Sequence, residues 1–450
     1  MQHSIHWTSF IASSVLSLSL VSALQVPSFQ ALINSGLSSS VSITRLKQVD
    51  FPSACGTVKG ICSEISYRPN DMIMDIPVSS AITTSENDDS VVQLAIQLIE
   101  EFHLEDESKF ASYIALLPPP GMIQTPFHWH EKEIESLTYP YVIKSIQLQK
   151  QKWKELFDAL PKDRLNRSVD FSRFIWGMEN VASRAFTGIL GVDALNLRAL
   201  SIASIASLIL GAVSFQITNN EVFPITLGIL AICLSLVPQF ITPKTSSTVL
   251  LPIIDSCNHQ GSSPMATLAL EPSSGRFTVR ANCDISAGSQ ITISYGKRSN
   301  DDLLQYFGFV EEDNVHDRYV IPAPLTRLKD ILLRESLSSQ ASSTLLAHIS
   351  ERLNTPNFID SSLIITRGPS DGWIMGSLDC LNEPAFRNSA EIEAERDTRL
   401  TYALRTLIEN EIDSFQKQVD LDAIDPRRRR IIETFRREKL RLLQFAIKSL

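Results

Sequence analysis

Several polar side chains that could do chemistry gather between residues 255 and 295 of the sequence. Asp255, Asn258 and His259 follow one another after an apolar segment, and Tyr295 closes a run that alternates like a strand. Arg184, further upstream, carries a planar guanidinium that can bind a carboxylate through two parallel hydrogen bonds. A lone histidine, a tyrosine at a strand end or a surface arginine is usually structural, so only the combination indicates a ligand site. The cysteines form no Cys-x-x-Cys pair, and nothing else indicates a zinc site or a disulfide framework.

The order and spacing of three motifs resemble those of the SET-domain protein methyltransferases. The resemblance is to the branch that contains the RuBisCO large-subunit lysine methyltransferase and the actin-histidine methyltransferase. The motifs are D-x-x-N-H at 255–259, Y-G-x-x-S-N at 295–300 and G-F at 308–309, and further matches lie at 101–118 and in Ser-Arg-Ala-Phe at 183–186. The resemblance covers about residues 46 to 450. It implies an α+β fold in which a SET domain with small sheets and a pseudoknot carries a helical insert and precedes an all-α substrate-binding domain.

The resemblance also implies an activity and a set of site residues. It predicts a protein-lysine N-methyltransferase that uses S-adenosyl-L-methionine, with Tyr295 as the catalytic residue beside the methyl group and the target nitrogen. Val58 stands where the family has the first glycine of a G-x-G cofactor loop, in which the backbone approaches the ligand closely. No metal is implied. The predicted cofactor-binding residues are Thr57, Val58, Lys59, Arg184, Asp255, Asn258, His259, Phe307, Gly308 and Phe309.

The chemistry of methyl transfer explains why such residues suffice. Displacement at a sulfonium by an amine needs alignment and exclusion of water. A desolvated, aromatic-lined channel lowers the lysine pKa from about 10.4 without a strong base. Phe307 replaces a tyrosine of the plant lysine enzyme, and loss of that hydroxyl predicts di- or trimethylation rather than monomethylation. The absence of a cysteine cluster after Phe309 favours a non-histone substrate. RuBisCO and a sugar-bisphosphate aldolase are the examples that the resemblance suggests.

Two other functions are compatible with the same motifs. The actin-modifying relative shares the scaffold, so protein-histidine methylation is one alternative. The other is a catalytically inactive SET-like membrane adaptor, although the joint presence of Tyr295, Asn258, His259 and Arg184 weighs against it. The net charge of −9 and the pI near 5.5 argue against binding to nucleic acid through phosphate contacts.

Hydrophobic patterns predict the elements that would position these residues. Strands are expected at 56–65 and 71–77, a helical block at 90–186, a hairpin at 266–270 and 276–280, and a strand at 290–295. Beyond Pro322 the pattern is helical to the end, with Asp425 and Pro426 opening a last helix. The many arginines of that helix are expected to form a solvated face, the alternative being a docking surface for an acidic protein or lipid headgroups.

The remaining segments carry addressing and membrane signals. Residues 1–23 resemble a signal peptide, and the acid-free, serine-rich 24–45 resemble a transit segment, which together predict a plastid or another endomembrane-derived compartment; simple secretion or an uncleaved anchor is the alternative. Two uncharged runs at 199–215 and 222–241 predict a transmembrane hairpin, or else a buried helical hairpin. The expected domains are 46–315 for the SET domain, with a helical insert at about 90–175 and the apolar hairpin at about 199–241, and 320–450 for the substrate-binding domain.

Overall fold

The computed structural model describes most of the chain outside its N-terminal and central apolar segments. Described are residues 29–34, 43–53, 56–83, 90–161, 169–189, 246–271, 275–334, 340–355, 360, 362–366, 373–374 and 390–450. The signal-peptide segment and the predicted hairpin at 199–241 lie outside these residues. None of the helices in the described ranges is both long and apolar enough to span a membrane.

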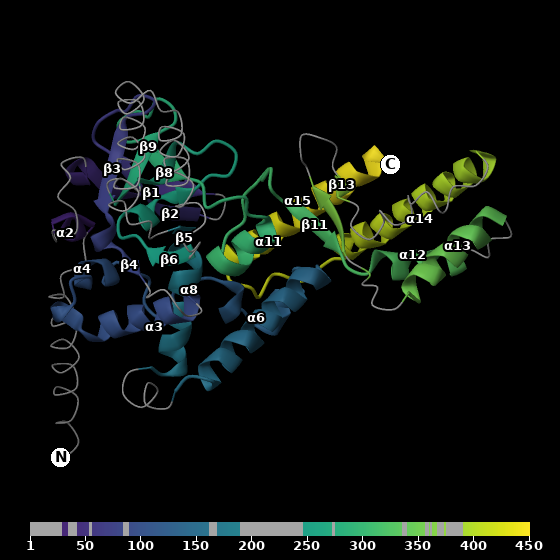
Figure 1. Cartoon of the computed structure of the whole chain (residues 1–450), viewed down its shortest axis with the longest axis horizontal. Coiled ribbons are helices and arrows are strands. Elements are labelled where there is room, and N and C mark those ends of the chain that lie inside the picture. Colours follow the sequence, from purple (N-terminus) through teal and green to yellow (C-terminus); the bar gives the residue numbers. More distant parts are fainter. Residues whose placement is uncertain are drawn as a thin grey trace, which may run out of the picture.

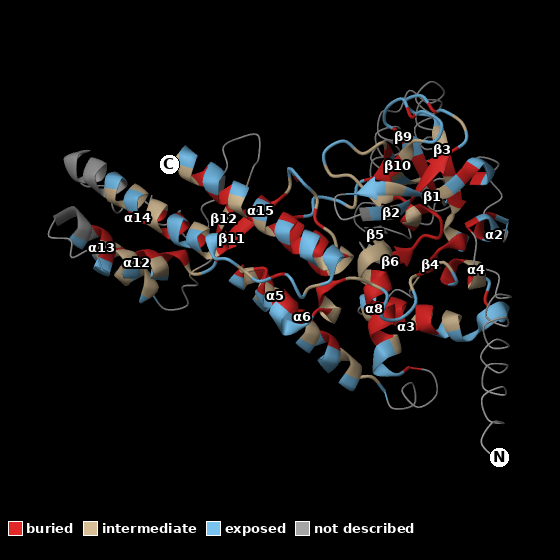
Figure 2. Cartoon of the chain, turned by 180° about the vertical axis from the view of Figure 1, so that it is seen from behind, coloured by how far each residue is buried: buried red, intermediate tan, exposed pale blue. Residues whose placement is uncertain are grey.

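The molecule is elongated, with most of its sheets at one end and the long C-terminal helices at the other (Figure 1). Two hydrophobic cores stabilise it. The first lies among the sheets and the helices next to them, and the second among the C-terminal helices. Figure 2 shows buried residues on the inward faces of the helices and exposed residues on their outward faces, as expected when amphipathic helices cover a core.

Three small sheets make up the first end of the molecule. Their orders are β1-β2-β10-β7, β3-β9-β8 and β4-β6-β5. Every strand pair in them is antiparallel except β10 with β7. The strands are β1 (Leu46–Ser53), β2 (Gly56–Ser63), β3 (Met72–Pro77), β4 (Ile82–Thr83), β5 (Ala185–Ile189), β6 (Ser246–Leu250), β7 (Asn258–His259), β8 (Ala266–Glu271), β9 (Arg276–Ala281) and β10 (Gln290–Ile293). The predicted strands and the predicted hairpin are confirmed.

Helices interrupt these strands where the sequence predicts a helical block. The longer ones begin at recognisable caps: Pro140 occupies the first turn of α6, and the Asp170 side chain accepts from the Arg173 amide at the start of α8. The helices are α3 (Ser90–His103), α4 (Ala111–Ile114), α5 (Glu131–Glu135), α6 (Pro140–Asp158) and α8 (Phe171–Arg184). Helix α8 ends directly in β5, so Arg184 lies at the junction of helix and strand.

One short helix lies in the segment expected to be a transit sequence. Helix α2 (Phe29–Asn34) buries Phe29, Leu32 and Ile33 in the first core. A domain boundary at residue 46 therefore excludes a helix that packs on the fold, and removal of 24–45 would expose the apolar surface that it covers.

The C-terminal half differs from the all-helical prediction because it contains a three-stranded sheet. β11 (Arg318–Ile321) pairs with β12 (Leu363–Thr366), which pairs with β13 (Trp373–Ile374). The helices around this sheet are α12 (Pro324–Arg334), α13 (Gln340–Leu353), α14 (Ala390–Gln416) and α15 (Pro426–Ser449). β12 is only four residues long, too short for an alternating pattern to show. The second core also includes Trp129 and residues of α5 and α6, so the insert and the C-terminal half share it.

Most arginines of α15 lie on an exposed face, as predicted, and several of them form ion pairs within the molecule. Arg428 pairs with Glu133, Arg429 with Asp422 and Glu433, and Arg437 with Glu312. Asp425 caps this helix as predicted, because its carboxylate accepts from the amides of Arg427 and Arg428.

Candidate active site

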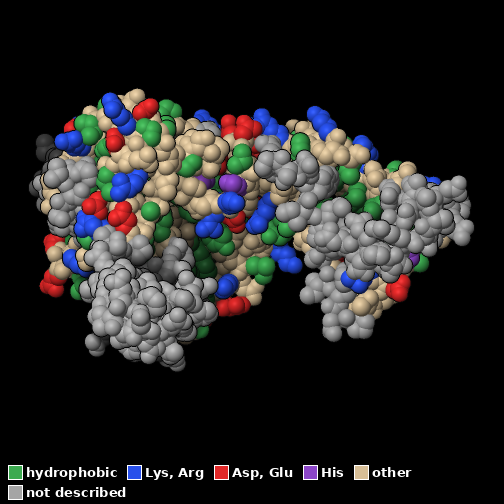
Figure 3. Space-filling model, turned by 45° about the horizontal axis from the view of Figure 1, so that its top comes forward, with side chains coloured by type: hydrophobic (Ala, Val, Ile, Leu, Met, Phe, Trp, Pro, Cys, Tyr) green, Lys and Arg blue, Asp and Glu red, His purple; other side chains and the backbone are tan. Residues whose placement is uncertain are grey.

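Two cavities meet at the residues predicted to carry chemistry. One, of about 390 Å³, is lined by residues of β1, β2, β7 and the segment around 307–310; the other, of about 600 Å³, is lined by β5, β8, β9 and the segment around 294–298. The residues that line both are Ser183, Arg184, Asp255, Tyr295 and Phe307. On the face drawn in Figure 3, Lys, Arg and His side chains gather near the middle of the molecule, between its two ends.

Asn258 is held at the wall of the smaller cavity by the backbone of β2. Its side-chain amide donates to the Lys59 carbonyl over 2.9 Å. This approach requires the neighbouring glycine: a Cβ on Gly60 would lie 2.7 Å from the Asn258 side-chain nitrogen and 2.5 Å from that of Gln290. Val58 and Lys59 line the same cavity, whereas Thr57 does not. The segment expected to be a cofactor loop is in fact part of strand β2, because all of it pairs with β1.

Arg184 is positioned by a buried carboxylate. Its Nη1 donates to the Asp255 carbonyl at 3.3 Å and lies 3.6 Å from Oδ2 of the same residue. Tyr113 donates its hydroxyl to that Oδ2 over 2.7 Å. Burial raises the pKa of Asp255, while the charge of Arg184 and the Tyr113 hydrogen bond lower it. Asp255 thus orients Arg184, whose Nε is buried without a hydrogen-bond partner among the described residues.

The backbone that leads to Asp255 is strained. Ile253 has φ 77° and ψ −53°, which is unusual for a β-branched residue and corresponds to a tight γ-turn. The turn brings Asp255 to the start of a short 3₁₀ helix, 254–256, from which it reaches both Tyr113 and Arg184. Such strain costs of the order of 1–3 kcal/mol and persists only where surrounding structure enforces it.

Tyr295 lies in an aromatic stack between the two cavities. Its ring stacks on His259 at a centroid distance of 5.0 Å and on Phe307 at 5.1 Å, and Phe307 meets Phe309 edge to face. The Tyr295 hydroxyl donates to the Cys257 carbonyl over 2.7 Å. Burial is the main reason that the pKa of Tyr295 lies well above its ordinary value, so the hydroxyl stays protonated. Tyr295 is a hydrogen-bond donor here and cannot be a strong base.

His259 supports this stack instead of opening its ring to the cavity. Its side chain is 1% exposed, and Nδ1 accepts a hydrogen bond from the Tyr295 amide over 3.0 Å. Burial lowers the His259 pKa below its ordinary value, although the charge of Glu311 opposes this. A neutral ring with its proton on Nε2 satisfies both observations, since a protonated ring could not accept from the Tyr295 amide.

Gly308 allows Phe307 and Phe309 to line the smaller cavity together. It ends a π-helical turn, η6 (Leu303–Phe307), with φ 72°, where glycine is the least strained residue. A Cβ at Gly308 would lie 2.9 Å from the Gln124 carbonyl oxygen, so the backbone passes close to the helical insert. Single π turns of this kind are common at functional sites.

The Ser299-Asn300 pair of the second motif has a structural task. Ser299 caps the short helix α11 (Asn300–Asp302), and the buried Asn300 side chain bonds to the backbone of Glu311 and to Asp317. These bonds tie the segment after Tyr295 to the segment after Phe309. Ser299 and Asn300 therefore shape the site without lining its cavities.

Of the predicted site residues, the structure brings together all except Thr57 around the two cavities. Sequence reasoning assigned no role to Tyr113, Cys257 or Glu311, whose contacts order Asp255, Tyr295 and His259. Tyr113 lies within the matched segment at 101–118, which was a usable signal. The part of Cys257 that acts is its backbone carbonyl, which no residue pattern could reveal.

Comparison with known proteins supports the fold. No family model matches the chain. The SET domain of LSMT bound to lysine and AdoHcy has a TM-score of 0.56 with 16% identity, covering 94% of this chain and 90% of that one. A structure of Rubisco LSMT bound to AdoMet has a TM-score of 0.55, also with 16% identity, covering 93% and 90%. The predicted α+β SET-domain fold, with small sheets and C-terminal helices, is confirmed.

Curated relatives match shorter stretches. The actin-histidine N-methyltransferase of Xenopus tropicalis is 28% identical over 140 residues, 31% of this chain and 22% of the relative. The ribosomal lysine N-methyltransferase 1 of Saccharomyces cerevisiae is 27% identical over 225 residues, 48% and 35%. The chain thus spans about a third or less of these relatives. The predicted resemblance to SET-domain methyltransferases is confirmed, and the two relatives differ in the residue that their names specify.

Proposed function

We propose that this chain, a SET-domain protein related to the Rubisco, ribosomal-lysine and actin-histidine methyltransferases, is an S-adenosyl-L-methionine-dependent methyltransferase that modifies lysine in a non-histone protein. One observation carries the proposal: two cavities of different lining share a boundary formed by Arg184, Asp255, Tyr295 and Phe307. Transfer between two bound molecules needs such a meeting point, since the reacting atoms must approach in line and away from water.

The smaller cavity has the donors and the shape that the methyl donor requires. The unpartnered Nε of Arg184 is available for a carboxylate, and Gly60 leaves room where Asn258 and Lys59 line the wall. Asn258, Arg184 and the backbone of β2 and β7 are the groups that would hold it. When bound, S-adenosyl-L-methionine would supply an electrophilic methyl group on a sulfonium.

The residues at the boundary would orient the incoming amine. The Tyr295 hydroxyl donates to the Cys257 carbonyl and keeps its oxygen lone pairs for an amine N–H. Phe307 and His259 both stack on the Tyr295 ring and hold it in place. The surrounding apolar residues favour the uncharged amine over the ammonium because a charge loses its hydration there.

The lining of the larger cavity favours lysine. Its wall is more apolar than polar and includes Phe186, Val249, Leu268, Leu270 and Phe277. Such a wall suits the methylene stem of a lysine, which gains from burial of its apolar surface. Histidine is the second candidate because actin-histidine methyltransferases match the sequence.

A labelling experiment distinguishes these substrates. The purified chain is incubated with heavy-methyl S-adenosyl-L-methionine and extract, and modified peptides are read by mass spectrometry. We expect label on lysine of a non-histone protein, as the di- or trimethyl form because Phe307 brings no hydroxyl to the boundary. Label on histidine would replace the leading candidate with the second.

Tyr295→Phe tests the assigned chemistry. We expect calorimetric titration to show unchanged affinity for S-adenosyl-L-methionine, while turnover falls roughly a hundredfold or more because the orienting hydroxyl is lost. Tyr67→Phe is the matched control, since the Tyr67 hydroxyl bonds to Ser63 and lines neither cavity. A wild-type chain that takes up no S-adenosyl-L-methionine would instead indicate the inactive adaptor.

A further inference from the structure

We propose that Glu311 is a positioning residue for Tyr295, acting through His259. The proposal rests on the proposed function in that Tyr295 is taken as the residue beside the reacting atoms. Glu311 follows the matched G-F motif and lines neither cavity. Its carboxylate nevertheless faces the buried side of the His259 ring, opposite the edge that contacts Tyr295.

A chain of contacts links Glu311 to His259 and His259 to Tyr295. Glu311 Oε2 lies 3.6 Å from His259 Nε2, a distance suited to electrostatic attraction or a bridging water rather than to a direct hydrogen bond. Among the described residues neither atom has a hydrogen-bond partner, and both are buried. The other ring nitrogen, Nδ1, accepts from the Tyr295 amide, and the two rings stack. A carboxylate on the Nε2 side favours the tautomer that leaves Nδ1 free to accept.

Gly261 provides the space that this arrangement needs. Its amide donates to Glu311 Oε1 over 2.8 Å, which aims the other oxygen at His259. A Cβ at Gly261 would lie 2.6 Å from Glu311 Oε2. Gly261, two residues after His259, thus binds the Glu311 carboxylate through its amide and leaves room for it because it has no side chain.

The charges around His259 define the expected pH dependence. Burial lowers the His259 pKa, Glu311 and a backbone hydrogen bond at Ile293 raise it, and the charges of His316 and Arg298 lower it. Protonation of His259 would break the bond from the Tyr295 amide, so activity should fall as pH drops through the His259 pKa. Removal of Glu311 lowers that pKa further, so the acid limb of the kcat profile should move to lower pH.

The test compares Glu311→Ala, Glu311→Gln and Gly261→Ala with the neighbouring control Glu312→Ala, whose side chain pairs with Arg437 on the surface. For Glu311→Ala we expect kcat to fall between about ten- and a hundredfold, because a displaced orienting group costs this much, with little change in KM for S-adenosyl-L-methionine. Glu311→Gln should retain more activity but show the same shift of the acid limb. Gly261→Ala should resemble Glu311→Ala, because it pushes the carboxylate away.

A spectroscopic readout separates this proposal from the assigned activity. Nitrogen chemical shifts of the His259 ring report its tautomer and pKa whether or not the chain transfers methyl groups. We expect the Nε2–H tautomer in the wild type and a lower His259 pKa in both Glu311 variants. An unchanged His259 pKa, or a Glu311→Ala variant with wild-type kcat and acid limb, overturns the proposal. A shifted His259 pKa in a chain without transferase activity would instead overturn only the proposed function.

Discussion

At the scale of single residues, the site consists of buried polar groups that hold one another and still leave some atoms without a partner among the described residues, among them Arg184 Nε and Asp255 Oδ1. Asp255 is the clearest case, because its carboxylate is fully buried and contacts both Tyr113 and Arg184. A buried charge is tolerated only when it is paired and hydrogen-bonded. Arg184 can therefore be held in one orientation with its Nε unpartnered, which is the state required for binding a carboxylate.

Tyr113→Phe should show how far Arg184 depends on this support. Loss of the hydroxyl leaves the Asp255 carboxylate with fewer donors and should cost about 1–3 kcal/mol of unfolding free energy. It should also raise the Asp255 pKa further, because the Tyr113 bond is one of the causes that lower it. The difference in unfolding free energy between Tyr113→Phe and the wild type should thus become smaller as pH falls and Asp255 becomes protonated.

The measurements are urea denaturation at two pH values and calorimetric titration with S-adenosyl-L-methionine. We expect severalfold weaker binding for Tyr113→Phe and unchanged binding for the control Tyr67→Phe. Equal affinity in both variants would show that Asp255 does not position Arg184.

The sequence could identify these residues only where chemistry is carried by side-chain type at a fixed spacing. Asn258, His259 and Tyr295 were found in this way, and the structure brings them to one boundary. His259 was predicted as a cofactor-binding residue from the motif, and it lines the smaller cavity, whereas its side-chain burial and its bond to the Tyr295 amide depend on tertiary packing. The Cys257 carbonyl and the Ile253 turn are backbone features, which residue identity does not encode.

At the scale of elements, the site depends on two strands that cross-link distant segments. β7 pairs in parallel with β10, which places Asn258 opposite Thr292 and His259 opposite Ile293, two residues before Tyr295. β10 pairs on its other side with β2. Residues 58–60, 258–259 and 295 are thereby brought together although about two hundred residues separate the first from the second.

Gly60→Ala should disturb this arrangement while leaving the identity of every functional side chain unchanged. The new Cβ would overlap Asn258 and Gln290 and should cost roughly 1–3 kcal/mol, since neighbours in a packed site must shift. We expect weaker binding of S-adenosyl-L-methionine by calorimetry, because the bond between Asn258 and Lys59 lengthens.

Gly121→Ala is the control for Gly60→Ala. Nothing lies within 4 Å of a Cβ at Gly121, although its φ of 78° makes the substitution strained. It should therefore lower the melting temperature slightly and leave binding unchanged. Weaker binding in both variants would trace the effect of Gly60→Ala to general instability.

Helices and strands were predicted correctly where their hydrophobic pattern extends over enough residues to be recognised. The helical block and the β8–β9 hairpin have clear patterns and turn residues, and both are confirmed. β12 and β13 are four and two residues long, and β12 pairs across more than forty residues with β11, so no local pattern marks them. Helix α2 was not predicted, because its serine-rich surroundings suggested a targeting segment and its six residues are too few for a clear helical pattern.

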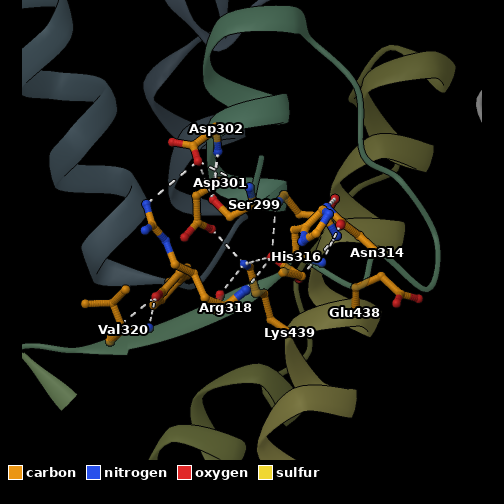
Figure 4. A network of polar contacts seen from close by, with 12 residues as sticks. Ser299, Asp301, Asp302, Asn314, His316, Arg318, Val320, Glu438 and Lys439 are labelled. Carbon is orange, nitrogen blue, oxygen red and sulfur yellow. Dashed lines mark hydrogen bonds and ion pairs between the residues drawn. The ribbon is translucent and has the colours of Figure 1, made fainter. Parts of the chain in front are cut away.

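At the scale of the whole molecule, a buried lysine of α15 links the C-terminal half to the segment next to the site. Lys439 of α15 is fully buried, with Nζ 2.8 Å from Asp301 Oδ1 and 2.7 Å from Asp317 Oδ1, and it donates to the Arg318 carbonyl (Figure 4). Asp317 also accepts from Asn300, which in turn holds the backbone of Glu311. The same helix contributes Arg427 to the lining of the smaller cavity. The position of α15 is thus coupled to the site through this network.

Lys439→Met should reveal the strength of that coupling and its pH dependence. Without the ammonium, two buried carboxylates lose their counter-charge, which should cost about 3–5 kcal/mol of unfolding free energy at pH 8. Burial raises the pKa of Asp301 to about 6 even with Lys439 present, so removal of Lys439 raises it further. A carboxyl with a raised pKa in the folded state binds protons more readily than in the unfolded state, and its protonation stabilises the fold as pH falls. The deficit of Lys439→Met should therefore be smaller at pH 5 than at pH 8.

Urea denaturation of the wild type and the variant at both pH values measures this difference. Lys154→Met is the matched control, since Lys154 forms an exposed pair with Asp158 on α6 and should lose less than about 1 kcal/mol at either pH. Because Lys439 also anchors the segment that carries Asn300 and Glu311, its loss should weaken S-adenosyl-L-methionine binding as well. A deficit that is the same at pH 5 and pH 8 would mean that the carboxylates find other partners, and that α15 is held by its apolar face alone.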